Sequence, residues 1–253
     1  MTRSRPLKFV PELYVGEKVD AHSHLGDFGS WANVACNEKE LLHSMKLYNV
    51  SKSVVFSLNN DLVKKAVARH PKELFGCVWP DPRRRDARKL VRTALTEWGF
   101  KGIKLHPLLH AFLPNDDIVH PIMDEARSAG VPVLVHSGHP PFSLPWSIGE
   151  LAENYRDVKV VMLHMGHGHG VYIQSAIGVG KRLANVYLET SGMPMHSKIR
   201  EAVELLGEKR VMYGSDIPFH DPSVEIGRVC ASGLSKKQLE RVFFANASEI
   251  LNL

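Results

Sequence analysis

The sequence of 253 residues contains little cysteine. Cys36, Cys77 and Cys230 lie far apart and are odd in number, which argues against a disulfide framework and a paired-cysteine zinc site. No run approaches roughly 18 consecutive apolar residues, so no membrane-spanning helix is expected. The basic first residues are not followed by an apolar run of signal-peptide length, and a cytoplasmic location is therefore expected.

A large excess of one charge is also absent. Lysine and arginine total 32 against 27 acidic residues, which gives a formal charge of +5 and a pI near 9.1. The one dense basic run, 83–85 with Arg88 and Lys89 behind it, is typical of the solvated face of a helix. We therefore expect no nucleic-acid partner and no membrane partner, but a small-molecule substrate that mild basicity would help to attract if it is anionic.

Short apolar runs rich in Val, Ile and Leu alternate with longer amphipathic segments along the chain. Runs of this kind are typical of strands buried on both faces. The predicted strands are 18–24, 53–58, 74–79, 102–106, 132–136, 159–164, 186–190 and 210–216. Apolar residues three and four positions apart predict helices over 38–48, 62–69, 87–97, 118–129, 148–155, 199–206 and 236–253.

Eight strands alternating with helices predict an α/β fold, a (β/α)8 TIM barrel. No linker or change of composition divides the chain, so residues 1–253 are expected to form a single domain. An open doubly wound sheet is the competing architecture, but it needs a glycine-rich nucleotide-binding turn after its first strand. The sequence has Ala21-His-Ser-His-Leu-Gly there instead.

Histidine is abundant, with 14 copies, and several of them end apolar runs. Active sites of α/β barrels lie at the carboxyl ends of the strands. The ionisable residues at the predicted strand ends are His22, His24, Lys104, His106, His136, His164 and Asp216. His22 and His24 share one face of a strand, roughly 6.6 Å apart along it, so their imidazoles can converge on one ion. With His136 and Asp216 on other strand ends, the pattern predicts a metal site.

Two of these residues allow several roles. His164 ends a strongly apolar strand, where it either bonds a backbone carbonyl as a core residue or acts in the site. Lys104 faces the barrel interior and must be paired, neutral or modified. It could bridge to a carboxylate, bind an anionic substrate or, when carboxylated, join two metal ions. The roles of the neighbouring histidines are left open: His106, His139, His167 and His169.

Six segments carry a family resemblance and follow one another in order. They are Val19-Asp-Ala-His-Ser-His-Leu-Gly, Phe100-Lys-Gly-Ile-Lys-Leu-His-Pro, Val133-Leu-Val-His-Ser-Gly, Leu163-His-Met-Gly, Tyr187-Leu-Glu-Thr-Ser-Gly and Arg210-Val-Met-Tyr-Gly-Ser-Asp-Ile-Pro-Phe. Together they resemble the amidohydrolase superfamily, in the branch that includes aminocarboxymuconate-semialdehyde decarboxylase and many metal-dependent hydrolases. The resemblance spans nearly the whole chain and says little about the substrate.

The resemblance implies one divalent metal ion, usually zinc, held by His22, His24, His136 and Asp216. His164 would touch the metal-bound water or polarise the substrate. A second ion would need a carboxylated Lys104 together with His136 and His164. The loops after the first two strands are short, so substrate residues on the insertions of larger members cannot be transferred.

The expected function is that of a metal-dependent hydrolase that cleaves an amide, ester, lactone or related bond of a small molecule. Asp216 would accept a proton from water activated by the ion, and His164 would polarise the carbonyl; Lys104 is the third residue expected to act in catalysis. The alternative is metal-dependent, non-oxidative decarboxylation of an aromatic or unsaturated carboxylic acid, which needs an Arg to hold the carboxylate. No Arg stands at a predicted strand end, unless Arg83 to Arg85 after the third strand serve. A barrel that binds metal or ligand without catalysis, and a homo-oligomer, are left open.

Overall fold

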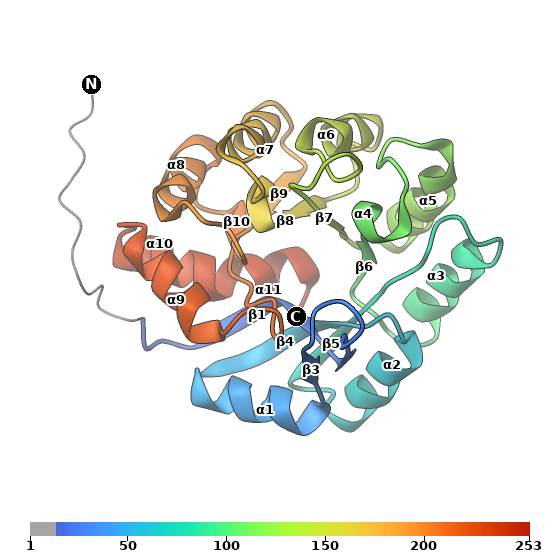
Figure 1. Ribbon diagram of the computed structural model, residues 1–253, viewed down its shortest axis with the longest axis horizontal. Coiled ribbons are helices and arrows are strands. Elements are labelled where there is room, and N and C mark those ends of the chain that lie inside the picture. Colours follow the sequence, from blue (N-terminus) through green and yellow to red (C-terminus); the bar gives the residue numbers. More distant parts are fainter. Residues whose placement is uncertain (1–13) are drawn as a thin grey trace.

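The computed structural model describes residues 14–253 and contains an eight-stranded parallel sheet whose helices surround it (Figure 1). Its strands, in the order in which they pair, are β1 (Lys18–His24), β4 (Val50–Phe56), β5 (Leu74–Val78), β6 (Gly102–Leu105), β7 (Val133–His136), β8 (Val160–Leu163), β9 (Val186–Glu189) and β10 (Val211–Met212). Two short strands, β2 (Gly26–Asp27) and β3 (Ala35–Cys36), pair antiparallel after β1. The predicted TIM barrel is confirmed.

The barrel closes between β1 and the chain that follows β10. The Ala21 amide donates to the Tyr213 carbonyl at 3.1 Å, and the Asp216 amide donates to the His22 carbonyl at 2.7 Å. The His24 amide completes the seam by donating to the Ile217 carbonyl at 2.8 Å. The last strand was predicted to reach residue 216 but ends at Met212, because the following residues bond to β1 instead of continuing along β9.

The helices are α1 (Glu38–Leu47), α2 (Asn60–Arg69), α3 (Ala87–Thr96), α4 (Pro107–His110), α5 (His120–Ala129), α6 (Pro145–Asn154), α7 (Gly170–Arg182), α8 (His196–Leu206), α9 (Pro222–Ala231), α10 (Lys236–Glu240) and α11 (Asn246–Leu251). Helices α7 and α9 are not among those predicted from the sequence. Both contain glycine, which weakens the helical signal. Between α10 and α11 the helical turn widens over 241–245, so one predicted helix becomes three consecutive segments.

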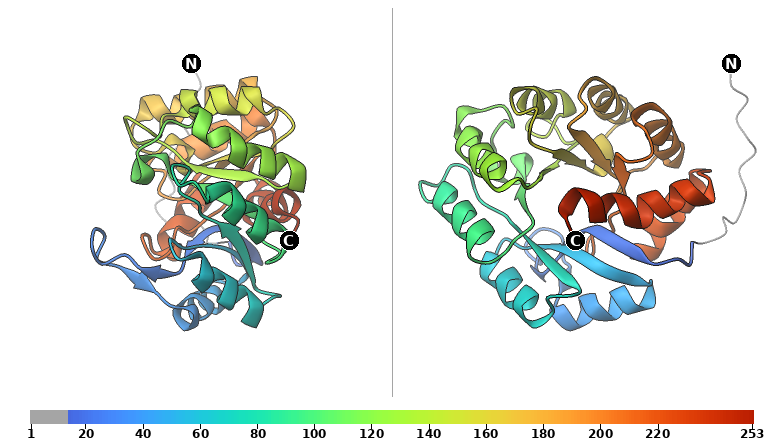
Figure 2. Two further views of the ribbon diagram at one scale, coloured as in Figure 1. Left: turned by 90° about the vertical axis from the view of Figure 1, so that its right-hand side faces the viewer. Right: turned by 180° about the vertical axis from the view of Figure 1, so that it is seen from behind.

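Two apolar layers hold the barrel together. The outer layer packs the helices on the strands, and the inner layer fills the barrel with side chains such as Val19, Val54 and Leu163. Ala247, Ile250 and Leu251 of α11 join this inner layer and cover one end of the barrel (Figure 2, right). The loop between β2 and β3, whose Trp31 stacks on Phe219, projects from the other end (Figure 2, left).

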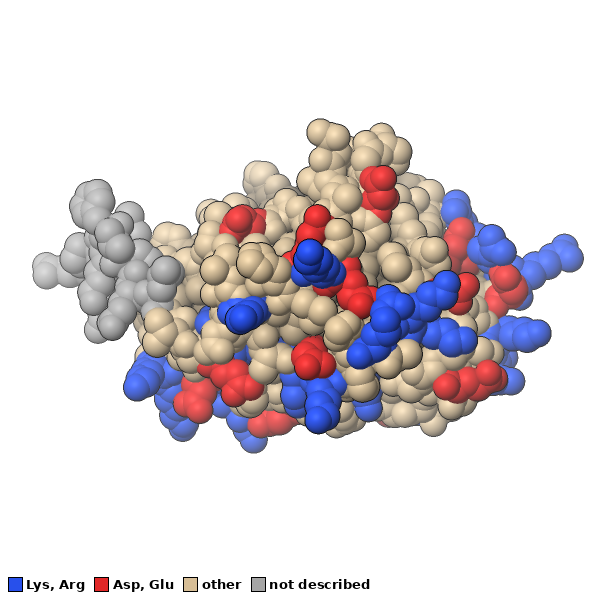
Figure 3. Space-filling model, turned by 90° about the horizontal axis from the view of Figure 1, so that it is seen from below, with Lys and Arg blue, Asp and Glu red and all other residues tan. Residues whose placement is uncertain are grey.

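Charged residues of both signs are mixed on the surface. On the face shown in Figure 3, acidic side chains lie among the basic ones. The basic run is neutralised locally, because Arg83 pairs with Asp81 at 2.8 Å, and Arg88 pairs with Glu125 at 2.7 Å. Within residues 14–253, none of the helices has the length and apolar character needed to cross a membrane.

Candidate functional site

Strand β1 presents the first polar residues of the site. All seven of its residues are buried, and Asp20, His22 and His24 alternate along it on one face. Asp20 accepts hydrogen bonds from the Ser215 amide at 2.9 Å and the Ser215 hydroxyl at 2.5 Å. Asp20 therefore fastens β1 to the segment that carries Asp216.

His22, His24 and Asp216 meet at this end of the barrel, as the sequence predicts. The Nε2 atoms of the two histidines lie 3.0 Å apart. Asp216 Oδ1 lies 3.2 Å from Nε2 of His22 and 3.1 Å from Nε2 of His24. Asp216 has φ of +57°, a left-handed conformation that turns its carboxylate toward the histidines after the strand has ended.

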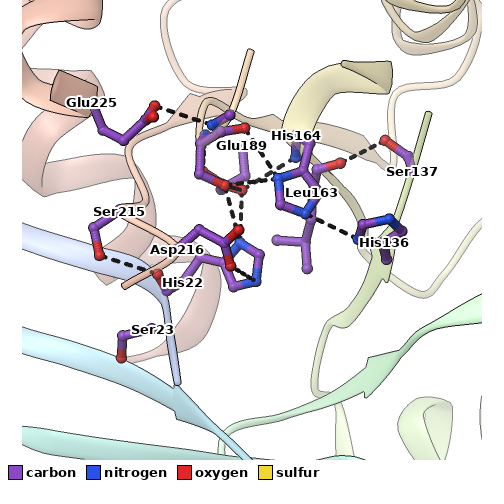
Figure 4. A network of polar contacts seen from close by, with 12 residues as sticks. His22, Ser23, His136, Ser137, Leu163, His164, Glu189, Ser215, Asp216 and Glu225 are labelled. Carbon is purple, nitrogen blue, oxygen red and sulfur yellow. Dashed lines mark hydrogen bonds and ion pairs between the residues drawn. The ribbon is translucent and has the colours of Figure 1, made fainter. Parts of the chain in front are cut away.

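Glu189 and Ser191 orient His22, and neither residue was assigned a role from the sequence. Nδ1 of His22 lies 3.1 Å from Glu189 Oε2 (Figure 4). The Ser191 hydroxyl donates to the same carboxylate at 2.8 Å. Burial raises the pKa of Glu189 to about 8, although hydrogen bonds from Ser191 and from the His164 amide oppose this rise. When Glu189 is ionised and accepts, Nδ1 of His22 carries the proton, and Nε2 of the neutral ring keeps a lone pair. The available signal was a carboxylate ending β9 within the segment Tyr187-Leu-Glu-Thr-Ser-Gly.

The donor set of His22, His24 and Asp216 fits a divalent metal. Nε2 of His22, Nε2 of His24 and Oδ1 of Asp216, all atoms of side chains that can bind metal, face one another across 3.0–3.2 Å. Ligand atoms bound near 2.1 Å to one tetrahedral ion lie about 3.4 Å apart, slightly farther than these separations. Glu189 on His22 supplies the outer carboxylate that commonly fixes the tautomer of a metal-binding histidine.

His136, the fourth predicted ligand, lies next to His164 and not within the triangle formed by His22, His24 and Asp216. Nε2 of His164 lies 3.0 Å from Nδ1 of His136. The ring of His164 is in turn 5.0 Å from the ring of His22, centroid to centroid (Figure 4). Nδ1 of His164 lies 3.1 Å from the Ser191 carbonyl, the partner that a core histidine would also have. The two histidines therefore border the triangle and were correctly placed at the same barrel end.

Lys104 points into the barrel and reaches the same site. Its Nζ lies 3.0 Å from Nε2 of His22 and stands over the rings of Phe56 and Trp79 at 5.0 and 5.5 Å. Burial lowers the pKa of Lys104 to about 8. The Lys104 amine is therefore still mostly protonated at pH 7. It gives the site a buried ammonium group at the end of a strand.

The remaining histidines separate into two groups. His106 stacks between Trp79 and His136, with ring centroids 5.7 and 3.8 Å away. His139 and His167 lie beside His136 at the mouth of the barrel. His169 is different, since it is exposed and accepts a hydrogen bond from the Val171 amide at the start of α7.

Burial keeps the site histidines neutral. It lowers the pKa of His22, His136 and His164 well below the usual range, and nearby cationic or histidine side chains act in the same direction. The pKa of His24 is also lowered by burial, although Asp216 opposes this change. Neutral imidazoles are the form that binds metal ions.

Aromatic side chains form one wall beside His24. Phe219 lies 5.2 Å from the His24 ring and 4.9 Å from Phe28, between centroids. Trp31, in the projecting loop, stacks on Phe219 at 5.2 Å and is 57% exposed. Aromatic side chains thus lead from the exposed Trp31 to His24 of the histidine and carboxylate triangle.

The family is shown by direct comparison. The family model described as amidohydrolase matches residues 48–253, which is most of the chain. The chain therefore belongs to the amidohydrolase family, in agreement with the resemblance found in its sequence motifs.

Several of the similar proteins are decarboxylases. The chain is 23% identical over 235 residues to the 2-amino-3-carboxymuconate-6-semialdehyde decarboxylase of Dictyostelium discoideum, a match covering 77% of this chain and 65% of that protein. It thus spans about two thirds of the length of this relative. The solved 5-carboxyvanillate decarboxylase of Sphingomonas paucimobilis superposes with a TM-score of 0.76 at 14% identity, covering 94% of this chain and 99% of the other. The dihydroxybenzoic acid decarboxylase of Polaromonas superposes with a TM-score of 0.74 at 14% identity, covering 94% and 97%.

These comparisons correct the reaction expected from the sequence. The expectation of hydrolysis is wrong, and the alternative, decarboxylation, is the better supported one. The error has a physical reason: a metal bound by histidines and a carboxylate can support either reaction, so the ligand pattern does not distinguish them. What remains of the expectation is an enzyme of the amidohydrolase superfamily.

The comparisons support a divalent metal but not zinc in particular. The solved Polaromonas enzyme contains manganese and the inhibitor 2-nitroresorcinol. Among residues 14–253, three groups of side chains have ligand atoms close enough to hold an ion, and two of these groups include His22. The preference for zinc is therefore unsupported, and the ligand set stays a prediction.

Proposed function

We propose that this protein is a metal-dependent, non-oxidative decarboxylase of a planar aromatic or unsaturated carboxylic acid. The observation that carries the proposal is the joint position of the His22, His24 and Asp216 triangle, the Lys104 ammonium and the aromatic wall. Relatives that share the family and fold act on acids of this kind.

His22, His24 and Asp216 would hold the divalent ion, with His136 as the predicted fourth ligand. When bound, the ion supplies positive charge that orients an acid and stabilises negative charge developing on it. Lys104 would hold the substrate carboxylate, the task for which a strand-end Arg was expected. Its buried ammonium group lies 3.0 Å from Nε2 of His22, beside the residues that would hold the ion. Phe219 and Trp31 would stack on the flat substrate and exclude water from it.

The reaction requires a proton at carbon. Asp216 would take a proton from water and pass it to the carbon that bears the carboxylate, where a π electron pair of the substrate forms the C–H bond. The C–C bond to the carboxylate would then break, its electron pair would restore the double bond, and carbon dioxide would leave. His164 is held in one orientation, because Nδ1 lies 3.1 Å from the Ser191 carbonyl and Nε2 lies 3.0 Å from Nδ1 of His136. To polarise a substrate group, Nε2 of His164 would have to exchange His136 for the substrate.

A panel of aromatic and unsaturated carboxylic acids tests this function. Carbon dioxide release should be measured with protein loaded with Mn²⁺ or Zn²⁺, and again after chelation. We expect release from at least one acid, its loss on chelation, and a fall of about a hundredfold or more in Asp216→Asn. Asp61→Asn, on an exposed position of α2, is the matched control and should keep wild-type turnover. An Asp216→Asn variant that binds metal and works at the wild-type rate would contradict the role of Asp216.

A further inference from the structure

His106 directly follows β6 and stands two residues after Lys104, and the sequence left its role open. Residues two apart along a strand share a face, so its side chain lies at the same end of the barrel as the ammonium group of Lys104. Its ring is nearly parallel to the rings of Trp79 and His136, with centroids 5.7 and 3.8 Å away. Lys104 is buried, whereas His106 is partly exposed and can therefore meet a ligand that enters from solvent.

One contact decides which ring nitrogen of His106 carries its proton. Nδ1 of His106 lies 3.2 Å from the backbone amide of Leu109, in the first turn of α4. An amide can only donate, so Nδ1 accepts and has the lone pair. Burial and the charge of Lys104 lower the pKa of His106 well below its usual range, and the ring is therefore neutral at pH 7. The single proton of the neutral ring is then on Nε2.

The Nε2–H group of His106 belongs to a part of the site that is rich in donors. It donates to no atom of residues 14–253. The indole Nε1–H of Trp79, which is 5% exposed, likewise has no partner within this range of the chain. Lys104 Nζ lies 3.0 Å from Nε2 of His22, an atom whose lone pair a bound ion would take. Donors gathered in this way around an ammonium group favour an anion as the ligand.

A capping role alone does not explain a histidine at position 106. Asn, Asp, Ser and Thr are the preferred residues before a helix, because their short side chains accept from an amide of the first turn. His106 accepts in the same way through Nδ1, but its ring adds a second nitrogen that these residues lack. The capping contact and the flanking rings of Trp79 and His136 also hold the ring in one orientation. A donor that is oriented before the ligand arrives lowers the entropy cost of binding.

We propose that His106, through Nε2–H, binds the carboxylate of the substrate together with the ammonium group of Lys104. The inference rests on the proposed function, because it assigns a second donor to the acid that Lys104 would hold. Two donors that bond to the two oxygens of a carboxylate fix its orientation as well as its position. A neutral amide of the same shape binds less well, because its NH2 group meets one of the donors.

Binding of benzoate to the Mn²⁺-loaded, full-length protein tests this inference without requiring turnover. Isothermal titration calorimetry should give a lower Kd for benzoate than for benzamide. We expect His106→Asn to raise the Kd for benzoate about tenfold or more, because Asn retains a capping acceptor and removes Nε2–H. The Kd for benzamide and the midpoint of thermal unfolding should stay close to those of the wild type. His43→Asn, at an exposed position of α1, is the matched control and should change none of these quantities.

The variant His106→Gln makes the opposite change, because it places an amide NH2 near the position of Nε2 and removes the cap. It should therefore retain more of the benzoate affinity than His106→Asn and unfold at a lower temperature. His106→Ser, which also retains a capping acceptor, replaces His106→Asn if that variant does not fold.

The outcomes distinguish the role of His106 from the proposed function. Weaker benzoate binding in folded His106→Asn supports this role even if no acid of the panel releases carbon dioxide, in which case the decarboxylase proposal alone fails. Wild-type affinity for benzoate in His106→Asn would overturn the inference. An equal loss of affinity for benzamide would also overturn it, as would a wild-type protein that does not bind benzoate.

Discussion

The substitution Glu189→Gln tests whether Glu189 orients the ring of His22 for metal binding. Glu189 is fully buried at the end of β9, and it holds Nδ1 of His22 at 3.1 Å. The carboxylate also accepts from the Ser191 amide and hydroxyl and from the His164 amide at 3.2 Å. The substitution keeps the shape of the side chain and replaces one acceptor oxygen by an NH2 group that can only donate.

Neither orientation of the new amide suits this pocket. With NH2 at the position of Oε1, two donors face each other at the Ser191 amide; with NH2 at Oε2, the donors from His22, His164 and the Ser191 hydroxyl lose their acceptor. A buried polar group left without a partner costs about 1–3 kcal/mol. Losing the outer carboxylate of a ligand histidine typically weakens metal binding about 10–100-fold. We expect both effects in Glu189→Gln.

Equilibrium dialysis with Mn²⁺ measures the affinity, and urea unfolding of the metal-free protein measures the stability. Glu204→Gln on α8, where the carboxylate is exposed and 3.8 Å from Arg200, is the matched control and should change neither quantity. A Glu189→Gln variant that binds Mn²⁺ with wild-type affinity would refute the idea that Glu189 sets the tautomer of His22.

Three further outcomes follow from the structure. Burial lowers the pKa of His22 and His24, so protons displace the metal only at more acidic pH. Dialysis at stepped pH should place the midpoint of metal loss below about pH 6.5. Metal loss that begins above about pH 6.5 would contradict a buried histidine site. Lys104→Met should raise the KM for a carboxylic acid substrate about tenfold or more, and an unchanged KM would exclude its contact with the carboxylate. Gly138→Ala should lower the free energy of unfolding by at least roughly 2 kcal/mol, because φ is +104° and the new Cβ would meet backbone atoms. Gly178→Ala in α7 is the control, because its Cβ would have free space, and it should raise the free energy of unfolding by about 0.5–1 kcal/mol. Equal unfolding midpoints of the two variants would contradict this expectation.

The fold could be predicted because each strand is a continuous apolar run. The β1 prediction has the observed bounds Lys18–His24, since both faces of that strand are buried. The closure of the barrel was harder to predict, because residues 213–217 form hydrogen bonds with β1, which lies almost at the other end of the sequence. Apolar periodicity reports local burial and contains no record of such long-range pairing.

The position of a site residue could be predicted where strand geometry alone determines it. Alternation along β1 places His22 and His24 on one face, and barrel topology brings Asp216 beside them. Topology does not fix how a side chain turns, and His136 therefore lies with His139 and His164 although its strand end was correctly placed. The reaction depends on what surrounds the ligands, which explains why hydrolysis was expected from a pattern that decarboxylases share.

Anomalous X-ray diffraction from crystals of the Mn²⁺-loaded protein would locate the ion itself. We expect a manganese peak within bonding distance, about 2.0–2.3 Å, of Nε2 of His22, Nε2 of His24 and a carboxylate oxygen of Asp216. A fully occupied manganese peak that touches none of these three side chains would contradict it.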